Sequence, residues 1–500
     1  GPPHPPSRYT ASSTLQRMEL LKTGYMGTLS LGWDNYLFLE LTGRQERSST
    51  LKDQSFFYPS ANLSFLFSNA FRMPAWWNHG KLRLSYGVVG NAPETYAANI
   101  IYEQGSDNGF TWNYVPSSWG NANIRPEKKY EYEIGFESKF LNNRLGFDVS
   151  YYNNRVKDQI LSTPQPSTSG VKYVLMNVGE VANEGWDISV SATPVLTKNF
   201  RWDLTANYGI YRNKVVKLAD GVPYLEISNI GGGGAKIQAV EGRPMGDIYV
   251  QVPQMNENGE YLVSDKGLYM NQTELQRVGN INPDGVGGLF SSFSYKNIFL
   301  DFSIDFRIGG DVINEMYQYS TASGLTPESL QFRDTEHGGL SYYYPGNNNA
   351  SGVPVQVDPS LGAGPNGETV YHDGVILPGV VASTGEKNTR IIPAGYYYNQ
   401  TYNWGTQPEQ LTYRHSVFDN SYVKLRELTI GYQFPEKLIS KLGMTRLSVS
   451  VFGRNLFYFY KALKNYDAES SVGTSWASQA VVGGSTTATR NFGVSLRASF

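Results

Sequence analysis

Apolar and polar residues alternate along much of this chain, and its last nine residues show the pattern most clearly. From Phe492 to Phe500 every second residue is Phe, Val, Leu, Ala or Phe, and the residues between them are Gly, Ser, Arg and Ser. Side chains of a β-strand point alternately to its two faces, so this segment has one apolar face and one small or charged face. A strand of a membrane barrel has this pattern, because lipid contacts one face and a wet interior contacts the other.

The same two-residue period recurs in twelve further segments, which makes roughly 13 predicted strands, most of them close to the ~9–11 residues that cross a bilayer at a tilt. They span residues 25–33, 37–44, 61–68, 81–86, 130–137, 145–151, 186–193, 202–208, 287–295, 300–308, 428–434 and 447–454. The pattern predicts an all-β fold, a transmembrane antiparallel β-barrel.

Within each predicted strand the charged residues fall on one face. An Arg or Lys facing lipid at the bilayer midplane costs about 2–4 kcal/mol, so Arg83, Asp305 and Arg307 are predicted to face the interior. A soluble β-sandwich with one dry face shares the two-residue period and stays the alternative. Aromatic residues near strand ends, such as Trp186 and Trp202, favour the membrane barrel.

Connections between the predicted strands alternate between short and long. Short ones include Asp34-Asn35 and Lys296-Asn297, whereas the long ones span residues 88–126, 155–185, 212–285, 309–421 and 455–491. Outer-membrane barrels have short periplasmic turns and long outer loops, so we expect the last strand to run inward, with Phe500 at the periplasmic rim. Counting back, residues 1–23 are expected to form an outer loop, and residues 24–500 the C-terminal part of a barrel.

An odd set of strands that begins outside cannot close into the even-numbered barrel of a single bacterial chain. Open strand edges in lipid would leave backbone groups unsatisfied at several kcal/mol each. We therefore expect the remaining strands to lie upstream, in a separate chain or in a part of the same protein. The first residues show no signal-peptide pattern, so a signal is also expected upstream.

Composition excludes several other classes. The net charge of −2 gives no reason to expect a nucleic-acid partner, and no run of about 18 apolar residues predicts a transmembrane helix. The five histidines lack metal-ligand spacing and cysteine is absent, so we expect no metal and no cofactor. No catalytic motif is present, and the carboxylates Glu131, Glu133 and Glu137 on one strand face are expected to be interior charges rather than a hydrolytic pair. The chain is predicted not to be an enzyme.

Aromatic residues in the long connections are the candidates for ligand contact, because their rings bury large areas against sugars or peptide side chains. Packing of the loops against one another, or contact with a partner, would also explain them. The candidates are Trp112, Tyr114, Trp119, Tyr342, Tyr343, Tyr344 and Trp404.

Several short motifs resemble the SusC/RagA type of TonB-dependent transporter. The most extended is Lys-Leu-Arg-Leu-Ser-Tyr-Gly-Val-Val-Gly-Asn at 81–91, which is similar to that family's signature strand and the loop start after it. The others follow in the family's order at residues 34–37, 44–49, 58–65, 177–180, 183–185, 279–285, 294–297, 422–428 and 453–456.

The resemblance implies a barrel of about 22 strands closed by an N-terminal plug, of which this chain would supply about 13 strands and no plug. It implies import of an oligomeric nutrient, glycan or peptide, across the outer membrane of a Gram-negative bacterium. The implied partners are a SusD-like surface lipoprotein, TonB acting through the absent N-terminal part, the missing strands and plug, and outer-membrane lipid. A structural or adaptor barrel, which scaffolds surface lipoproteins or another outer-membrane complex without import, is the alternative.

Overall fold

A computed structural model of the chain describes residues 18–51, 55–99, 102–107, 110–165, 168, 170–405, 408–410, 412–471, 473–484 and 487–500. Residues 1–17, most of the predicted outer loop, lie outside these ranges. The first strand already includes Lys22 and Thr23, so it begins two residues before the boundary expected from the sequence.

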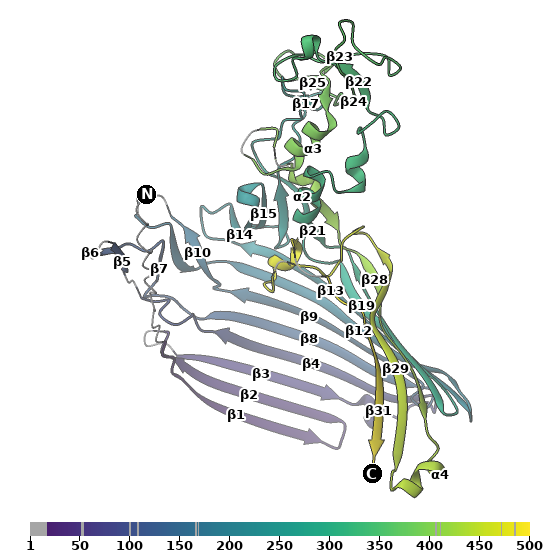
Figure 1. The fold of residues 1–500 in the computed structure, drawn as a ribbon. Coiled ribbons are helices and arrows are strands. Elements are labelled where there is room, and N and C mark those ends of the chain that lie inside the picture. The colour runs from purple at the N-terminus through teal and green to yellow at the C-terminus, as the bar shows by residue number, and fades with distance from the viewer. Residues whose placement is uncertain are drawn as a thin grey trace, which may run out of the picture. The chain divides into compact units, whose positions relative to one another are not determined.

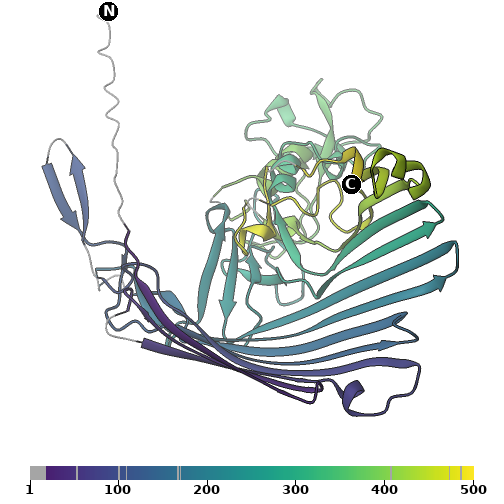
Figure 2. The same cartoon turned by 90° about the horizontal axis from the view of Figure 1, so that it is seen from below.

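The thirteen predicted strands are confirmed, and they form one antiparallel sheet in the order β1-β2-β3-β4-β8-β9-β12-β13-β19-β20-β28-β29-β31 (Figure 1). Figure 2 shows the same strands from below. Their bounds are β1 Lys22–Trp33, β2 Leu37–Ser48, β3 Ser55–Phe65, β4 Trp77–Asn91, β8 Glu127–Phe140, β9 Leu145–Lys157, β12 Glu180–Leu196, β13 Phe200–Lys217, β19 Gly285–Tyr295, β20 Ile298–Ile308, β28 Tyr422–Gln433, β29 Arg446–Lys461 and β31 Asn491–Ser499.

Most strands are longer than their alternating cores. β13 has 18 residues, for example, whereas its apolar–polar alternation spans only residues 202–208. The residues after 208 include the polar run Arg212-Asn213-Lys214 and then Val215, which is buried with Leu218 and Ala239, so this end of the strand has left the alternating pattern. Alternation alone therefore predicts where a strand crosses the membrane better than where its hydrogen bonding ends.

One face of the sheet is apolar although it is exposed on this chain; we call it the outward face. The opposite, interior face carries Arg83, Asp305 and Arg307, as predicted. Apolar residues on the outward face that are about half exposed or more include Leu29, Leu31, Ile134, Trp186, Ile430, Val451, Phe492, Val494 and Leu496. A lipid-facing surface requires exposed, large apolar side chains at alternate positions of each strand.

The short connections between strands adopt the backbone conformation of tight turns, as their sequences predict. Lys296 adopts a φ of 52° in the two-residue hairpin between Tyr295 and Ile298, and Asp34 and Asn35 adopt φ values of 43° and 56°. Residues with positive φ match the twist of tight hairpins. These turns bring consecutive strands side by side.

The long connections are folded rather than extended. Residues 88–126 and 155–185 carry β5 (Glu103–Asp107), β6 (Phe110–Tyr114), β7 (Ser118–Trp119), β10 (Ile160–Pro164) and β11 (Tyr173–Asn177). Residues 212–285 carry β14 (Tyr224–Ile230), β15 (Ala235–Val240), β16 (Asp247–Val250), β17 (Leu262–Val263) and β18 (Gln276–Asn280). Residues 309–421 carry β21 (Asp311–Asn314), α2 (Glu315–Ala322), β22 (Leu340–Tyr343), β23 (Val355–Gln356), β24 (Val370–Val375), β25 (Val380–Val381), β26 (Ile392–Pro393), α3 (Ala394–Tyr402) and β27 (Val417–Asp419), and residues 455–491 carry β30 (Val481–Val482).

Four short α-helices form among the described residues. They are α1 (Phe67–Ala70), α2, α3 and α4 (Glu436–Ile439). The side chain of Asn314 caps α2 by accepting from the backbone N–H of Tyr317 at 2.9 Å, and α3 contributes Tyr398 and Tyr402 to a buried aromatic cluster. Among the described residues, no helix has both the length and the apolarity needed to cross a bilayer.

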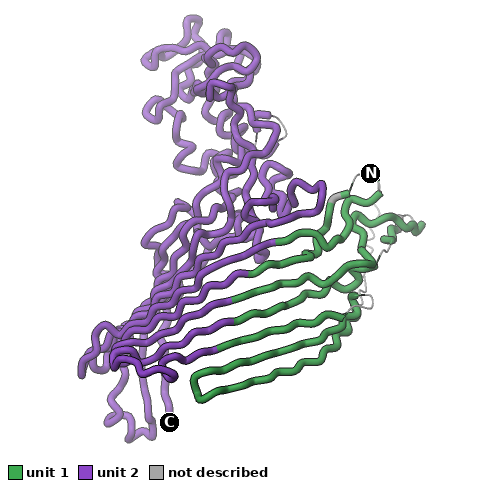
Figure 3. The backbone as a smooth tube through the Cα atoms, turned by 180° about the vertical axis from the view of Figure 1, so that it is seen from behind, with its two compact units in different colours: residues 1–63, 85–132, 154–180 green, residues 64–84, 133–153, 181–500 purple. Residues whose placement is uncertain are grey.

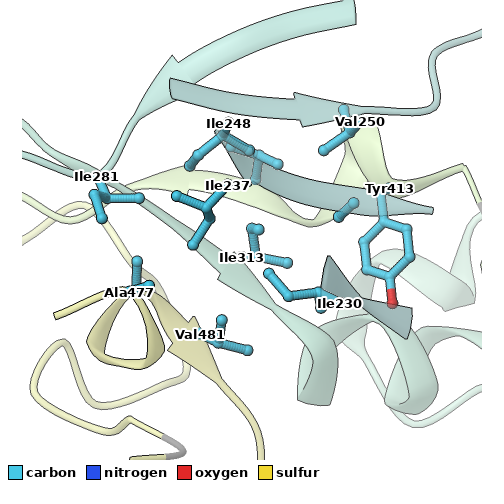
Figure 4. Close-up of a cluster of buried hydrophobic side chains, with 12 residues drawn as sticks. Ile230, Ile237, Ile248, Val250, Ile281, Ile313, Tyr413, Ala477 and Val481 are labelled. Carbon is cyan, nitrogen blue, oxygen red and sulfur yellow. The ribbon is translucent and has the colours of Figure 1, made fainter. Parts of the chain in front are cut away.

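The segments 212–285, 309–421 and 455–491 pack on a shared hydrophobic core, and we call them together the loop layer. Twelve buried side chains form this core, drawn in Figure 4. β21 pairs with β27 and, in parallel, with β30, which joins the second and third segments. The core residues are Ile230, Ala235, Ile237, Ile248, Val250, Ile281, Ile313, Tyr413, Val417, Ala477, Ala480 and Val481.

The chain divides into two compact units, coloured separately in Figure 3. Unit 1 contains residues 1–63, 85–132 and 154–180, and unit 2 contains residues 64–84, 133–153 and 181–500. Unit 1 has its own small core around Leu51, Phe56 and Ile124. The loop layer and the interior-facing site described next both belong entirely to unit 2.

Candidate substrate-binding site

The interior face of unit 2 contains a cavity of about 650 Å³ lined mostly by polar side chains. They come from β4, β9, β12, β13, β20 and β28, at alternate positions on each strand, so the two-residue period places them on one surface. The polar side chains at its interior-facing positions are Arg83, Asp148, Ser150, Asp187, Ser189, Asn207, Tyr211, Asp305, Arg307 and Tyr422. We call this surface the interior wall.

Arg83 reaches across a neighbouring strand to bind the next one. Its Nη2 donates to Asp148 Oδ1 at 2.5 Å and to Ser150 Oγ at 3.2 Å, and its Nη1 lies 3.4 Å from Glu137 Oε2. The side chain passes over Gly135 of β8, where an added Cβ would come within 2.8 Å of the Arg83 Nε. Glycine at position 135 therefore permits a guanidinium to join β4, β8 and β9 on the interior wall.

A second glycine opens the wall beside Asp187. The Cβ position of Gly209 lies 2.5 Å from the Tyr211 hydroxyl and 3.1 Å from Asp187 Oδ1. The two polar groups thus meet over the bare backbone of β13. A phenol and a carboxylate side by side can accept and donate hydrogen bonds to hydroxyl or amide groups of a bound molecule.

Arg307 fixes the outer end of β20 to the start of the loop layer. Its Nε donates to the carbonyl of Gly309 at 3.2 Å and its Nη2 to the carbonyl of Ile281 at 3.0 Å. Gly310 has a φ of 79°, and a Cβ there would lie 2.3 Å from Arg307 Nη2. This guanidinium satisfies backbone acceptors, so it is a structural tie rather than a free charge for a ligand.

The last long segment is held to the wall by an ion-pair network. Arg426 donates through Nε to Asp305 at 3.0 Å and through Nη1 to Glu469 at 2.9 Å, while the buried Lys424 ammonium also contacts Glu469. Burial alone would raise the pKa of Glu469, but the two cations hold that pKa below its ordinary value. Asp467 extends the network by accepting from the Tyr458 hydroxyl at 2.5 Å.

The aromatic candidates divide by exposure. In unit 1, Trp112 and Tyr114 project from the β5–β6 hairpin and are 48% and 44% exposed, while Trp119 on β7 is half-buried. In unit 2, Trp404 is 60% exposed, and its Nε1 donates to the carbonyl of Gly231 at 3.3 Å.

The aromatic candidates Tyr342, Tyr343 and Tyr344 pack inside unit 2 and are less exposed than Trp112, Tyr114 and Trp404. Tyr342 and Tyr344 are buried with Ile391, at 1% and 9% exposure, and Tyr343 is half-buried. Because their rings already fill a core, we do not propose Tyr342 or Tyr344 as ligand contacts. The glycine run at 231–234 likewise has a packing reason, since the Tyr413 hydroxyl lies where a Cβ of Gly231 would be.

The rule that the charged residues of each strand share one face also puts Asp148 and Asp187 on the interior side, but it cannot show what they contact. The pairing of Arg83 with Asp148, two strands away, depends on the register of the strands and on Gly135 between them. The alternation of apolar and polar residues predicts neither. Glu469 was missed entirely because it lies in an irregular segment. A carboxylate at such a position gives no periodic signal.

The comparisons with known proteins agree with this geometry. The family model "TonB dependent receptor-like, beta-barrel" matches residues 3–248, about half of the chain. TonB-dependent receptor P3 of Formosa agariphila is 22% identical over 494 residues, covering 90% of this chain and 42% of that protein. TonB-dependent receptor SusC of Bacteroides thetaiotaomicron is 27% identical over 256 residues, covering 45% of this chain and 24% of that protein.

Among solved structures, the RagAB peptide transporter matches with a TM-score of 0.69 at 19% identity, covering 96% of this chain and 48% of that chain. The chain thus spans less than half the length of these relatives. The family consists of outer-membrane transport proteins of Gram-negative bacteria, so the predicted location and the prediction that the chain is not an enzyme are confirmed. This chain belongs to the TonB-dependent receptors, and its thirteen-stranded sheet has the outer-membrane β-barrel fold of the SusC/RagA type.

Proposed function

We propose that the protein imports an oligomeric nutrient, a glycan or a peptide, across the outer membrane. The observation that carries the proposal is the polar cavity of about 650 Å³ on the interior wall, in the same compact unit as the loop layer. Carboxylates, hydroxyls and the amide of Asn207 along this wall offer many weak hydrogen bonds. Such a surface suits a polar oligomer that must bind and then move on.

The names of the similar proteins support a role in import. The structure with the TM-score of 0.69 is described as a peptide transporter, and SusC is named as a TonB-dependent receptor. We infer that a SusD-like surface lipoprotein covers the loop layer, and that TonB supplies energy through a part of the protein beyond the matched region. The exposed rings of Trp112, Tyr114 and Trp404 are proposed to contact cargo or this lipoprotein.

Asp187 is the interior residue that we expect to contact cargo, since it lies beside Tyr211 on the cavity wall and the described residues give it no cationic partner. Arg83 and Asp305, in contrast, are each held in ion pairs. Asp187→Asn should therefore lower uptake while leaving the barrel assembled. Asp265→Asn, which removes the same charge from a loop-layer carboxylate bonded to Ser383, is the matched control.

The test is uptake of labelled oligosaccharides and peptides by cells that carry the intact protein, the Asp187→Asn variant or the Asp265→Asn variant. We expect uptake of one class, its abolition by an uncoupler of the inner membrane, and a reduction of about threefold or more for Asp187→Asn only. The paired charges on the wall would equally suit a structural or adaptor barrel. Loss of surface lipoproteins without any loss of uptake, when the protein is deleted, would support that second function.

A further inference from the structure

A second, smaller cavity lies on the outward face of unit 2, away from the interior wall. Its volume is about 280 Å³, and three consecutive strands of the sheet, β9, β12 and β13, line it. The lining residues are Tyr151, Glu184, Gly185, Trp186, Ile210 and Arg212.

Alternation places these side chains on the outward face. Tyr211 meets Asp187 on the interior wall, so its neighbours Ile210 and Arg212 point outward. In the same way Tyr152 covers Gly185 on the interior side, with its hydroxyl 2.4 Å from the Cβ position, and this leaves Tyr151 outward.

The cavity lies where the outward face changes from apolar to charged. Along β12 the outward residues run from Ile188 and Trp186 to Glu184, and along β13 they run from Tyr208 and Ile210 to Arg212. β9 makes the same change just after Tyr151, at Asn153 and Arg155. Long segments follow this end of the strands, so this level is the boundary between hydrocarbon and head groups in the outer leaflet.

The cavity combines three kinds of contact. The rings of Tyr151 and Trp186 lie 4.9 Å apart and form an aromatic wall. The Tyr151 hydroxyl donates to Glu184 Oε2 at 3.4 Å, which leaves the other carboxylate oxygen as an acceptor. Arg212 has no ion pair or hydrogen bond to any of the residues that the structure describes, in contrast with Arg83 and Arg426 on the interior wall.

We propose that this cavity binds the phosphorylated sugar head group of an outer-leaflet glycolipid. The Arg212 guanidinium pairs with the phosphate in its two-pronged geometry, the aromatic wall stacks on the sugar, and Glu184 accepts from a sugar hydroxyl. The acyl chains continue over the apolar band below, which begins at Trp186 and Ile210. A membrane lipid therefore fits this cavity better than a soluble phosphate does. The proposal rests on the membrane position of the barrel and does not depend on which cargo it imports.

The test uses the protein as isolated from outer membranes, with any partner chains that it carries, in phosphatidylcholine nanodiscs. Native mass spectrometry measures retention of monophosphorylated lipid A and of its dephosphorylated form. Arg212→Gln should weaken retention of the phosphorylated lipid about tenfold and leave the dephosphorylated lipid unchanged. Arg201→Gln removes the same charge from the opposite end of β13, where Arg201 pairs with Asp203, and should change neither.

Arg212→Lys keeps the positive charge but loses the two-pronged guanidinium, so it should weaken retention of the phosphorylated lipid by roughly threefold. This variant replaces Arg212→Gln in the test if the glutamine variant assembles poorly. Equal retention of both lipid forms, or equal weakening by Arg201→Gln, would overturn the proposal. Competition by inorganic phosphate or by phosphatidylethanolamine as effective as that by lipid A would also overturn it, because the site would then recognise phosphate without the glycolipid.

Discussion

The interior wall and the loop layer belong to the same compact unit, yet they are held together by different forces. The wall is joined across strands by charges, such as Arg83 with Asp148 and Arg426 with Asp305. The loop layer is joined by twelve buried, mostly aliphatic side chains, of which Ile237 and Ile313 are fully buried. The difference follows from the solvent: the wall faces water and its strands face lipid on the other side, and the largest buried hydrophobic cluster among the described residues of this unit lies in the loop layer.

This contrast predicts that a substitution acts according to the medium that its side chain meets. Damage to the outward face should prevent assembly, whereas damage to the loop-layer core should unfold that layer alone. The two regions can therefore be separated by assays that report on each: heat-modifiable migration for the barrel, and limited proteolysis for the loop layer.

The largest effect is expected for a charge introduced on the outward face of β20. Ile304→Arg places a guanidinium in lipid at a cost of about 2–4 kcal/mol, which should largely abolish assembly. Ser303→Arg, one residue earlier, points to the interior opposite Glu427 and should assemble nearly as well as the unaltered protein. The folded fraction in outer membranes measures both, and similar yields for the two variants would contradict the assignment of faces.

A cavity in the loop-layer core should affect the protein less than a failure of assembly does, because it acts on that layer alone. Ile237→Ala should destabilise the loop layer by about 2–5 kcal/mol, since the side chain is fully buried and its neighbours collapse only in part. Proteolysis of residues 212–285 should accelerate while heat-modifiable migration stays unchanged. Val353→Ala, at a side chain that is 61% exposed, is the control and should change neither. A barrel that loses its folded migration with Ile237→Ala would show that the two regions are not separable.

Acid should lower the stability of the loop layer and leave the membrane-spanning strands unchanged. Burial lowers the pKa of His415 to about 4, with a contribution from the neighbouring Arg414. Between about pH 6.5 and pH 4 the imidazole of His415 is protonated in the unfolded state and neutral in the folded state. The free energy of unfolding of the loop layer therefore falls as the pH drops from about 6.5 towards 4. At pH 5 the loss is about 2 kcal/mol. His415→Gln should remove most of the change in proteolysis rate between pH 7 and pH 5; an unchanged pH dependence would exclude His415 as its source.

The smallest effect is expected where the two regions meet, at Arg426 and Glu469. Breaking this partly buried pair should release residues 462–471 from the wall. A double-mutant cycle of Arg426→Gln and Glu469→Gln, read by protease accessibility, should give a coupling energy of about 1 kcal/mol. Additive effects would mean that the two side chains do not act as a pair. Lys217 and Asp220 form an exposed pair that supplies the control cycle, with a coupling near zero.

The sequence predicted the strands and their faces because alternation is a local signal with a period of two residues. Arg83, Asp305 and Arg307 could be assigned to the interior from this signal alone. It could not give the partners of Arg83, because reaching Asp148 requires Gly135 on the strand between them. Nor could it reveal the loop layer, because Ile237, Ile313 and Val481 meet from three segments far apart in the chain.

The aromatic residues show the same limit. Tyr342 and Trp112 look alike in sequence, since each lies in a polar connection among other aromatic residues. The structure buries the first at 1% exposure and leaves the second 48% exposed. Only tertiary packing distinguishes an aromatic ring that builds a loop from one that is free to contact a ligand.

The central claim is that alternate residues of each long strand meet lipid and water. The chain contains no cysteine, so single cysteines can be placed one at a time from residue 300 to residue 307 of β20 and spin-labelled. Collision rates with oxygen, which partitions into lipid, and with a water-soluble nickel complex should alternate with opposite phase. Positions 300, 302, 304 and 306 should favour oxygen, and positions 301, 303, 305 and 307 should favour nickel. Equal access of nickel to both sets, in the membrane-inserted protein, would contradict the account.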